Sequence, residues 1–284
     1  MSTLGPFGVW TAHLRSRDRG KIAAVAAAVE ECGYGTAWIP GAFGGELLGD
    51  VDAALAATSR ITVATGVLNI WAHDAGEVAA WVRRHHSDRL LLGLGASHPQ
   101  AIAAYAKPLA AMTAYLDALD AAAVPADQRI LAALGPKMLA LAGARSLGAH
   151  TYFVDVEHTR VARAALGDGP VIAPELKVVL DPDPARARAV ARAHLAYYLE
   201  LTNYTRNLLR TGYTEADLAD GGSDRLVDGV VAWGDAESVA RRAQAHLDAG
   251  ADHICVQVLT ADRREVPYEA WKELAAALRQ QVSV

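Results

Sequence analysis

Two cysteines, no basic cluster and no long apolar run distinguish this sequence of 284 residues. Cys32 and Cys255 are far apart in the chain, so we expect two reduced thiols, as is usual in a cytoplasmic protein. The net charge of −5 without a basic run argues against nucleic acid or an anionic membrane as a partner. The apolar runs are short and interrupted by charges, so no transmembrane helix is expected. The first residues, MSTLGPFGVWTAHL, lack a charged start followed by a long apolar stretch, so no secretory signal is expected.

Motifs of several enzyme classes are also missing. The sequence has ten histidines but no His-Glu-x-x-His and no cysteine pair at ligand spacing, so we expect no metal site. The absence of Gly-x-Ser-x-Gly argues against a serine hydrolase.

The chain alternates short β-branched or apolar runs with alanine-rich amphipathic segments. This alternation predicts parallel strands joined by helices through right-handed crossovers. Nearly continuous apolar strands indicate that both faces of the sheet are buried. The strand candidates are residues 7–12, 35–40, 61–68, 89–94, 129–134, 150–155, 175–180 and 253–258. The helix candidates are residues 18–32, 50–58, 74–86, 107–122, 136–146, 157–166, 183–212, 235–249 and 267–281.

Eight such units in 284 residues predict a single α/β domain, a (β/α)8 TIM barrel, over residues 1–284. The alternative is an open doubly wound sheet, which is weakened because no Gly-x-Gly-x-x-Gly follows the first strand candidate. Residues 183–233 are too long for one crossover. We expect them to form an insertion after the seventh strand, with a long helix, a short helix at 214–219 and a glycine-rich loop at 220–223.

Polar residues follow several of the predicted strands. In a TIM barrel the carboxyl ends of the strands form the active face, so we expect these side chains to gather at one mouth. Asn69 and Trp71 follow the third strand, whereas Asp74 precedes Glu77 in a helix-capping pattern. His13 follows the first strand and Glu46 lies in the glycine-rich loop after the second.

Two strand-to-helix turns are candidate anion sites. Gly135, Pro136 and Lys137 follow the fifth strand, and a helix start there offers backbone N–H groups and a favourable dipole. Gly95, Ala96, Ser97 and His98 follow the fourth strand, where small residues allow a ligand to approach the backbone. Either segment is also compatible with an ordinary turn.

Several stretches together resemble a known family. They are GYGTAWIP, TSRITVATGVLNIWAHD, RLLLGLGASH, LAALGPKMLALAG and LVDGVVAWGDAESVARRAQAHLDAGADHICVQVL. Their order and spacing resemble the luciferase-like monooxygenase superfamily and, within it, the coenzyme F420-dependent oxidoreductases of actinobacteria. The resemblance extends over most of the chain.

The resemblance implies a (β/α)8 barrel that binds F420 across the mouth and transfers a hydride to or from a small organic substrate. FMN with a monooxygenase activity, or a barrel that binds a flavin without turnover, are the alternatives. A non-proline cis peptide in residues 68–71 would back the cofactor ring at Asn69, Ile70 and Trp71. Phosphate would bind at residues 135–137 and at the helix start with His158 and Thr159. A homodimer is usual in the family.

One position departs from the family pattern. Several F420-dependent enzymes have a catalytic histidine in a Ser-Asp-His run after the second strand, where this chain has Pro40-Gly41-Ala42. We expect His98, Glu46 or His13 to take the place of that histidine as the catalytic group.

Overall fold

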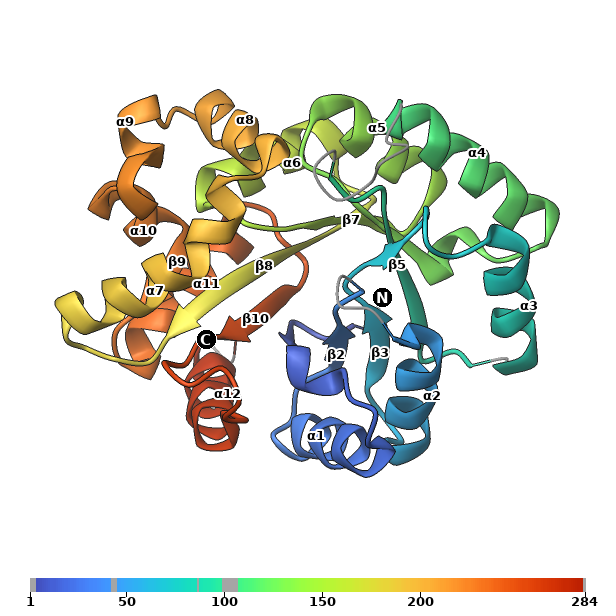
Figure 1. The fold of residues 1–284 in the computed structure, drawn as a ribbon, viewed down its shortest axis with the longest axis horizontal. Coiled ribbons are helices and arrows are strands. Elements are labelled where there is room, and N and C mark those ends of the chain that lie inside the picture. Colours follow the sequence, from blue (N-terminus) through green and yellow to red (C-terminus); the bar gives the residue numbers. More distant parts are fainter. Residues whose placement is uncertain (1–3, 42–44, 86, 99–106, 283–284) are drawn as a thin grey trace.

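Eight parallel strands close into a barrel surrounded by helices (Figure 1). The structure is a computed structural model, and it describes residues 4–41, 45–85, 87–98 and 107–282. The barrel strands are β1 (Phe7–Trp10), β2 (Thr36–Ile39), β3 (Thr62–Thr65), β5 (Leu90–Gly95), β6 (Arg129–Ala132), β7 (Gly148–Thr151), β8 (Val171–Val179) and β10 (Ile254–Val258).

The last strand closes the barrel against the first. Val256 in β10 is paired with Val9 in β1 on one side and with Leu176 in β8 on the other. An open sheet would leave two unpaired edges, so the predicted TIM barrel is confirmed and the doubly wound alternative is wrong.

The predicted helices surround the barrel, and their starts are fixed by capping side chains. Asp18 and Asp155 accept hydrogen bonds from backbone N–H groups in the first turns of α1 and α6. Asp74 caps α3 as predicted, because its carboxylate accepts from the N–H groups of Gly76 and Glu77. The helices are α1 (Arg19–Glu31), α2 (Leu47–Ala57), α3 (Ala75–His85), α4 (Pro108–Ala121), α5 (Pro136–Arg145), α6 (Val156–Leu166), α11 (Ala236–Asp248) and α12 (Tyr268–Val282), with short 3-10 turns η1 (Ala12–Leu14) and η2 (Ala126–Gln128).

The barrel interior is filled by side chains and is not a channel. Trp38 lies at its centre, stacks on His150 with 4.4 Å between ring centroids, and donates to His253 Nε2 at 3.0 Å. Ala64, Leu91 and other buried residues complete this inner cluster. The larger apolar core lies outside the strands, between the barrel and the helices.

The segment between β8 and β10 forms a group of helices on one side of the barrel (Figure 1). It contains α7 (Pro184–Leu199), α8 (Thr202–Arg210), α9 (Glu215–Leu218), η3 (Ala219–Gly221), α10 (Asp224–Val230) and a short strand, β9 (Val231–Trp233), which pairs with the end of β8. The expected single helix over residues 183–212 is two helices, because the backbone at Leu201 turns to an extended conformation. The sequence also did not predict α10 or β9.

These helices share an apolar core with the carboxyl ends of the strands. Phe153 after β7, Val179 in β8 and Leu259 after β10 are buried in that core, and Leu134 after β6 packs against it. The helices therefore cover the sector of the barrel mouth formed by β6, β7, β8 and β10. Among the described helices, none is both long and apolar enough to cross a membrane.

Candidate functional site

A backbone bulge follows β3 at the barrel mouth. The peptide bond between Gly66 and Val67 is cis. The resemblance located this bond in residues 68–71, so that prediction is wrong by at least two residues, and the cis bond lies nearer the end of β3. The bulge comprises residues 66–71. Within it, the short strand β4 (Leu68–Asn69) pairs with the end of β5.

The bulge is tied to the loop after β5 by its polar groups. Asn69 Oδ1 accepts a hydrogen bond from Trp71 N at 3.0 Å, and Trp71 Nε1 donates to the carbonyl oxygen of Ala96 at 2.7 Å. Ile70 N donates to the carbonyl oxygen of Gly95 at 3.0 Å. The side chain of Ile70 is buried in the outer core, so this residue presents only its backbone. The structure thus brings five of the predicted cofactor-binding residues together.

Gly95 has a packing reason to be glycine. A Cβ atom at this position would lie 2.5 Å from Val67 Cγ2, a distance that real side chains do not tolerate. Glycine at this position therefore lets the bulge fold against β5, and its role is to shape the mouth.

His98 lies next to the helices over the mouth. Its ring centroid is 5.3 Å from that of Tyr204 in α8. Burial lowers the pKa of His98, and the neighbouring Asn203 side chain partly opposes this shift. His98 Nδ1 and Asn203 Oδ1 are buried and make no well-formed hydrogen bond within the described residues. Ser97, just before it, has a positive φ of 59°, which turns the chain so that His98 can reach α8.

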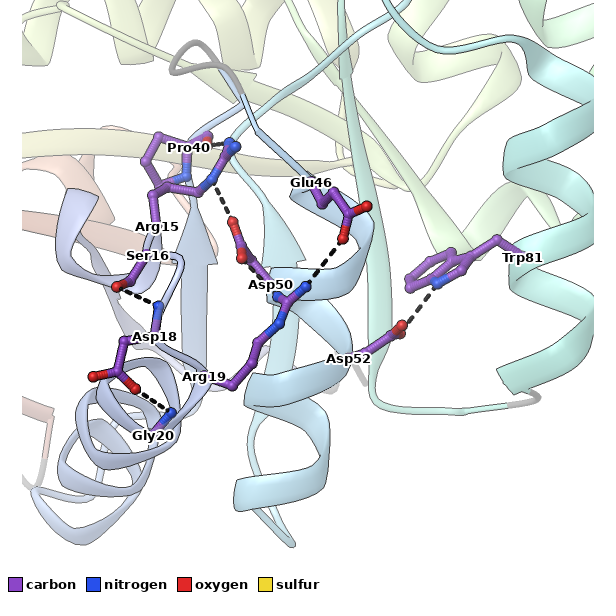
Figure 2. Close-up of polar contacts among 10 residues, drawn as sticks. All are labelled: Arg15, Ser16, Asp18, Arg19, Gly20, Pro40, Glu46, Asp50, Asp52 and Trp81. Atoms are coloured by element: carbon purple, nitrogen blue, oxygen red, sulfur yellow. Dashed lines mark hydrogen bonds and ion pairs between the residues drawn. The ribbon is translucent and has the colours of Figure 1, made fainter.

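Glu46 and His13 lie elsewhere on the rim. The Glu46 side chain is 85% exposed and pairs with Arg19 at 3.3 Å, beside the closer Arg19–Asp50 pair (Figure 2). Arg15 joins Asp50 to the carbonyl oxygen of Pro40, so these ion pairs hold the start of the loop after β2 (Figure 2). His13 is half-buried in η1, where desolvation lowers its pKa. Of the three predicted catalytic residues, only His98 adjoins the helices over the mouth.

The start of α5 is surrounded by hydrogen-bond donors. Gly135 is the N-cap, and no side chain caps this helix. Arg210 of α8 donates to the carbonyl oxygen of Leu134 at 3.1 Å and also bonds to Asn207. Its second terminal nitrogen lies 3.6 Å from the place where a Cβ of Gly135 would be. In the described part of the chain, neither Arg210 nor Lys137 belongs to an ion pair, so two cations stand near an uncapped helix start.

Two buried side chains at the same place have free polar atoms. His158 Nε2 contacts the carbonyl oxygen of Leu134 at 3.1 Å, while its Nδ1 has no partner among the described residues. Asn207 Nδ2 is also buried and unpartnered. Thr159 lies deeper, because its hydroxyl contacts His246 Nδ1 at 2.8 Å between α6 and α11. His158 therefore lies at the predicted anion site with Nε2 donating to Leu134 and Nδ1 left as an acceptor, and Thr159 packs behind it.

The sequence did not single out an aromatic cluster that lies at the centre of the mouth. Tyr152, after β7, has its ring centroid 5.7 Å from Trp10 and 5.4 Å from Tyr198 of α7. Trp10 Nε1 donates to the carbonyl oxygen of Gly66 at 2.8 Å, so the cluster reaches the bulge. Tyr204 completes it, with 5.6 Å between its ring centroid and that of Tyr198.

A buried ion pair lies beneath this cluster. Lys177 Nζ is 2.7 Å from Glu175 Oε2 and 3.9 Å from the ring centroid of Tyr152. Both charged side chains are almost fully buried, and burial lowers the pKa of Lys177 and raises the pKa of Glu175. Glu175 also accepts from Phe153 N. Lys177 and Phe153 N both contact Glu175 Oε2, while Glu175 Oε1 is buried without a hydrogen-bond partner among the described residues.

The interior residues become more exposed toward the mouth. Trp38 and Ala64, one layer down, are fully buried, whereas Gly66, Val67 and Ala132 at the mouth remain partly exposed. These partly exposed residues lie on the side of the bulge that faces the aromatic cluster through Trp10. Apolar walls with a few polar groups suit a flavin or deazaflavin ring, so the residues fit such a cofactor.

One hollow among the described residues lies apart from this mouth. A hollow of about 440 Å³ is bordered by Asp52, His85, Arg89 and neighbouring residues at the carboxyl ends of α2 and α3, which is the opposite end of the barrel. Within the described ranges, no group of three or more His, Cys, Asp or Glu side chains is arranged to hold a metal ion.

A closed parallel barrel with polar groups and a bulge at the carboxyl ends of its strands is typical of (β/α)8 enzymes. Residues 1–253 match the family model described as luciferase-like monooxygenase. The chain belongs to this family, which is part of a superfamily of oxidoreductases and monooxygenases. No curated protein matches the chain.

Solved structures with the same fold include enzymes with two kinds of cofactor. An F420-dependent secondary alcohol dehydrogenase in complex with an F420–acetone adduct has 15% identity and a TM-score of 0.74, over 98% of this chain and 100% of its own. The coenzyme F420-dependent tetrahydromethanopterin reductase from Methanopyrus kandleri has 15% identity and a TM-score of 0.73, over 97% and 99%. The oxygenating constituent of 3,6-diketocamphane monooxygenase from Pseudomonas putida, in complex with FMN, has 16% identity and a TM-score of 0.63, over 95% and 96%. At these identities the similarity shows the fold alone.

Proposed function

We propose that the protein is an F420-dependent oxidoreductase that transfers a hydride between the deazaflavin and a small organic substrate. The observation that supports this most is the start of α5, where Arg210, Lys137 and the free amide nitrogen of Asn207 can donate to an anion. A phosphate at a helix start is favoured by the helix dipole, and Lys137 supplies the first backbone N–H, because Pro136 has none and those of Met138 and Leu139 bond to Gly135. In the described part of the chain no acidic side chain pairs with these two cations.

The positive charge at this place also supports F420 over FMN. Arg206 lies one turn before Arg210 on α8, is exposed, and has no ion pair among the described residues. F420 has a long acidic tail beyond its phosphate, according to the family resemblance. Lys137, Arg206 and Arg210 together would meet that tail, whereas FMN carries a single phosphate.

The residues of the mouth would have different roles in such an enzyme. The cofactor, when bound, supplies or accepts the hydride. The bulge at residues 66–71 would support one face of the ring, and the start of α5 would bind the phosphate. His98 would exchange a proton with the substrate, because burial lowers its pKa and keeps its ring neutral near pH 7, with one nitrogen accepting and one donating.

The test is a pair of fluorescence titrations of the purified protein, one with F420 and one with FMN. We expect tighter binding of F420, and an affinity that decreases as salt increases. The variant Arg206→Gln/Arg210→Gln should weaken F420 binding more than FMN binding. Arg84→Gln, which removes an exposed charge from the end of α3, is the matched control. Tighter binding of FMN would reject the F420 assignment in favour of a monooxygenase, and no binding of either would reject both. We also propose a homodimer from the family resemblance, which light scattering would measure.

A further inference from the structure

Two tyrosine hydroxyls meet at the centre of the mouth. Tyr152 OH lies 2.8 Å from Tyr198 OH and donates to Gln257 Oε1, also at 2.8 Å. Tyr152 directly follows β7, Tyr198 lies in α7 and Gln257 lies in β10, so the contact joins the barrel to the helices that cover it. Tyr152 and Tyr198 keep part of their surface exposed, while Gln257 is buried behind them.

The rings are held so firmly that the hydroxyls have little freedom. Lys177 Nζ lies 3.9 Å from the ring centroid of Tyr152 and 5.1 Å from that of Tyr198, which is within the range of cation–π attraction. The ring of Phe153 packs against Tyr198 at 5.5 Å between centroids. Burial raises the pKa of Tyr198 to about 12 and that of Tyr152 well above its ordinary value. Both hydroxyls therefore stay protonated at physiological pH.

Tyr198, Tyr152 and Gln257 form a row of hydrogen-bonded groups. The donors and acceptors in this row leave the Tyr198 hydroxyl as its free end. Tyr152 gives its single proton to Gln257, so Tyr198 donates to the oxygen of Tyr152 and keeps a lone pair that can accept. If the Gln257 amide turns its NH2 toward Tyr152, the row reverses and the proton of Tyr198 points outward. The row can therefore receive an alcohol O–H or donate to a carbonyl oxygen, and bonds in such a row strengthen one another.

The neighbourhood of the row suits an uncharged molecule. The apolar rings of Trp10, Tyr204 and Phe153 pack beside Tyr152 and Tyr198 and are themselves buried. The charged groups under the row, Lys177 and Glu175, are buried and offset each other's charge.

We propose that the Tyr198 hydroxyl, supported by Tyr152 and Gln257, binds the oxygen of a neutral ketone or alcohol with an apolar body. Such a compound has one oxygen for the row and an apolar remainder for the rings. The inference rests on the proposed function only in treating this compound as the substrate. The binding itself requires no cofactor.

The test compares two ligands of nearly equal shape on the cofactor-free protein. Acetophenone carries a carbonyl oxygen, and α-methylstyrene carries a CH2 group in its place. Calorimetry should show tighter binding of acetophenone to the unaltered protein, by about threefold to tenfold, the usual worth of one neutral hydrogen bond. Tyr198→Phe should remove this preference, and Tyr152→Phe should reduce it. The substitutions retain the rings, and a thermal midpoint near that of the unaltered protein confirms folding.

Tyr197→Phe is the matched control, because Tyr197 is the neighbouring residue of α7 and its side chain is exposed. It should leave the preference for acetophenone unchanged. Persistence of the preference in Tyr198→Phe, or its absence from the unaltered protein, would overturn the proposal. F420 and FMN titrations of the same variants separate the two claims. If neither cofactor binds but the ketone preference depends on Tyr198, the proposed function fails and this inference stands.

Discussion

Replacement of Gly135 by valine tests whether the start of α5 binds the cofactor phosphate. Gly135 has a φ of −91° and an extended ψ of 157°, a conformation that valine adopts readily. Among the described atoms outside its own chain neighbours, only Arg210 Nη1 lies within 4 Å of the added Cβ, at 3.6 Å. The glycine is therefore not needed for the fold, and its replacement fills space that the proposal assigns to a phosphate.

The expected effects on stability and on binding differ in size. Valine is a poorer N-cap than glycine, which costs roughly 0.5–1 kcal/mol and lowers the thermal midpoint of a chain of this size by only about 1–2 °C. Blocking the phosphate should weaken F420 binding by at least about tenfold, or about 1.4 kcal/mol. Lys137→Ala should weaken binding less, because an exposed charge contributes about 0–1 kcal/mol.

The assay is a thermal melt and an F420 titration of each variant beside the unaltered protein. A folded Gly135→Val variant with unchanged affinity would show that phosphate does not bind there. A variant that unfolds would show instead that Gly135 only shapes the turn. Equal losses from Gly135→Val and Lys137→Ala would point to the lysine charge alone as the binding group.

Two further substitutions have clear expectations. Lys177→Met leaves the Glu175 carboxylate buried and unpaired, so we expect the free energy of unfolding in denaturant melts to fall by about 3–5 kcal/mol. The double variant Lys177→Met/Glu175→Gln should recover much of this loss. A single variant as stable as the unaltered protein would contradict the role of the pair. His98→Gln should lower kcat about 100-fold or more if His98 exchanges the proton. Glu46→Gln, on an exposed side chain, should change kcat little. A large loss of kcat in Glu46→Gln with little loss in His98→Gln would make Glu46 the catalytic group.

The barrel could be predicted because each strand is a short apolar run followed by an amphipathic helix. All eight predicted barrel strands exist, although β7 and β8 begin earlier than expected. The first half of β8 contains Pro174, a residue that usually argues against a strand. The start of β8 was missed for that reason.

The covering helices were harder to predict because their limits depend on tertiary contacts. Residues 183–212 read as one amphipathic helix, yet Leu201 breaks it and is buried in the second core. The short strand β9 exists only because the end of β8 is free to pair with it.

Residues of the candidate site could likewise be predicted where the signal is local in the sequence, and not where it depends on tertiary contacts. The bulge with Asn69 and Trp71 was predictable, because polar residues directly after a barrel strand must lie at the mouth. Tyr198 and Arg210 could not be found by that rule, since they come from helices whose placement over the mouth is a tertiary fact. Lys177 and Glu175 left a usable signal, as two charges two residues apart on an apolar strand face the same side and must pair when buried.

Buried histidines predict that the protein loses stability in mild acid. His150 and His253 are buried in the barrel interior, where desolvation lowers the pKa of each to about 4. A folded pKa below the unfolded value of about 6.5 means that protons bind the unfolded chain first. Their contribution is therefore intact above about pH 6.5 and is lost as the pH falls toward 4.

Across that pH range, protonation of each of these histidines would lower the free energy of unfolding by up to about 3 kcal/mol. This is a large part of an ordinary free energy of unfolding of roughly 5–15 kcal/mol. Urea melts at intervals between pH 7 and pH 4.5 should thus show a steep decline in the free energy of unfolding. His150→Phe retains a ring to stack on Trp38 but cannot titrate, so its decline should be shallower by about one proton. Equal slopes for the two proteins, or a stability that is flat over this range, would show that His150 is not held neutral by the fold.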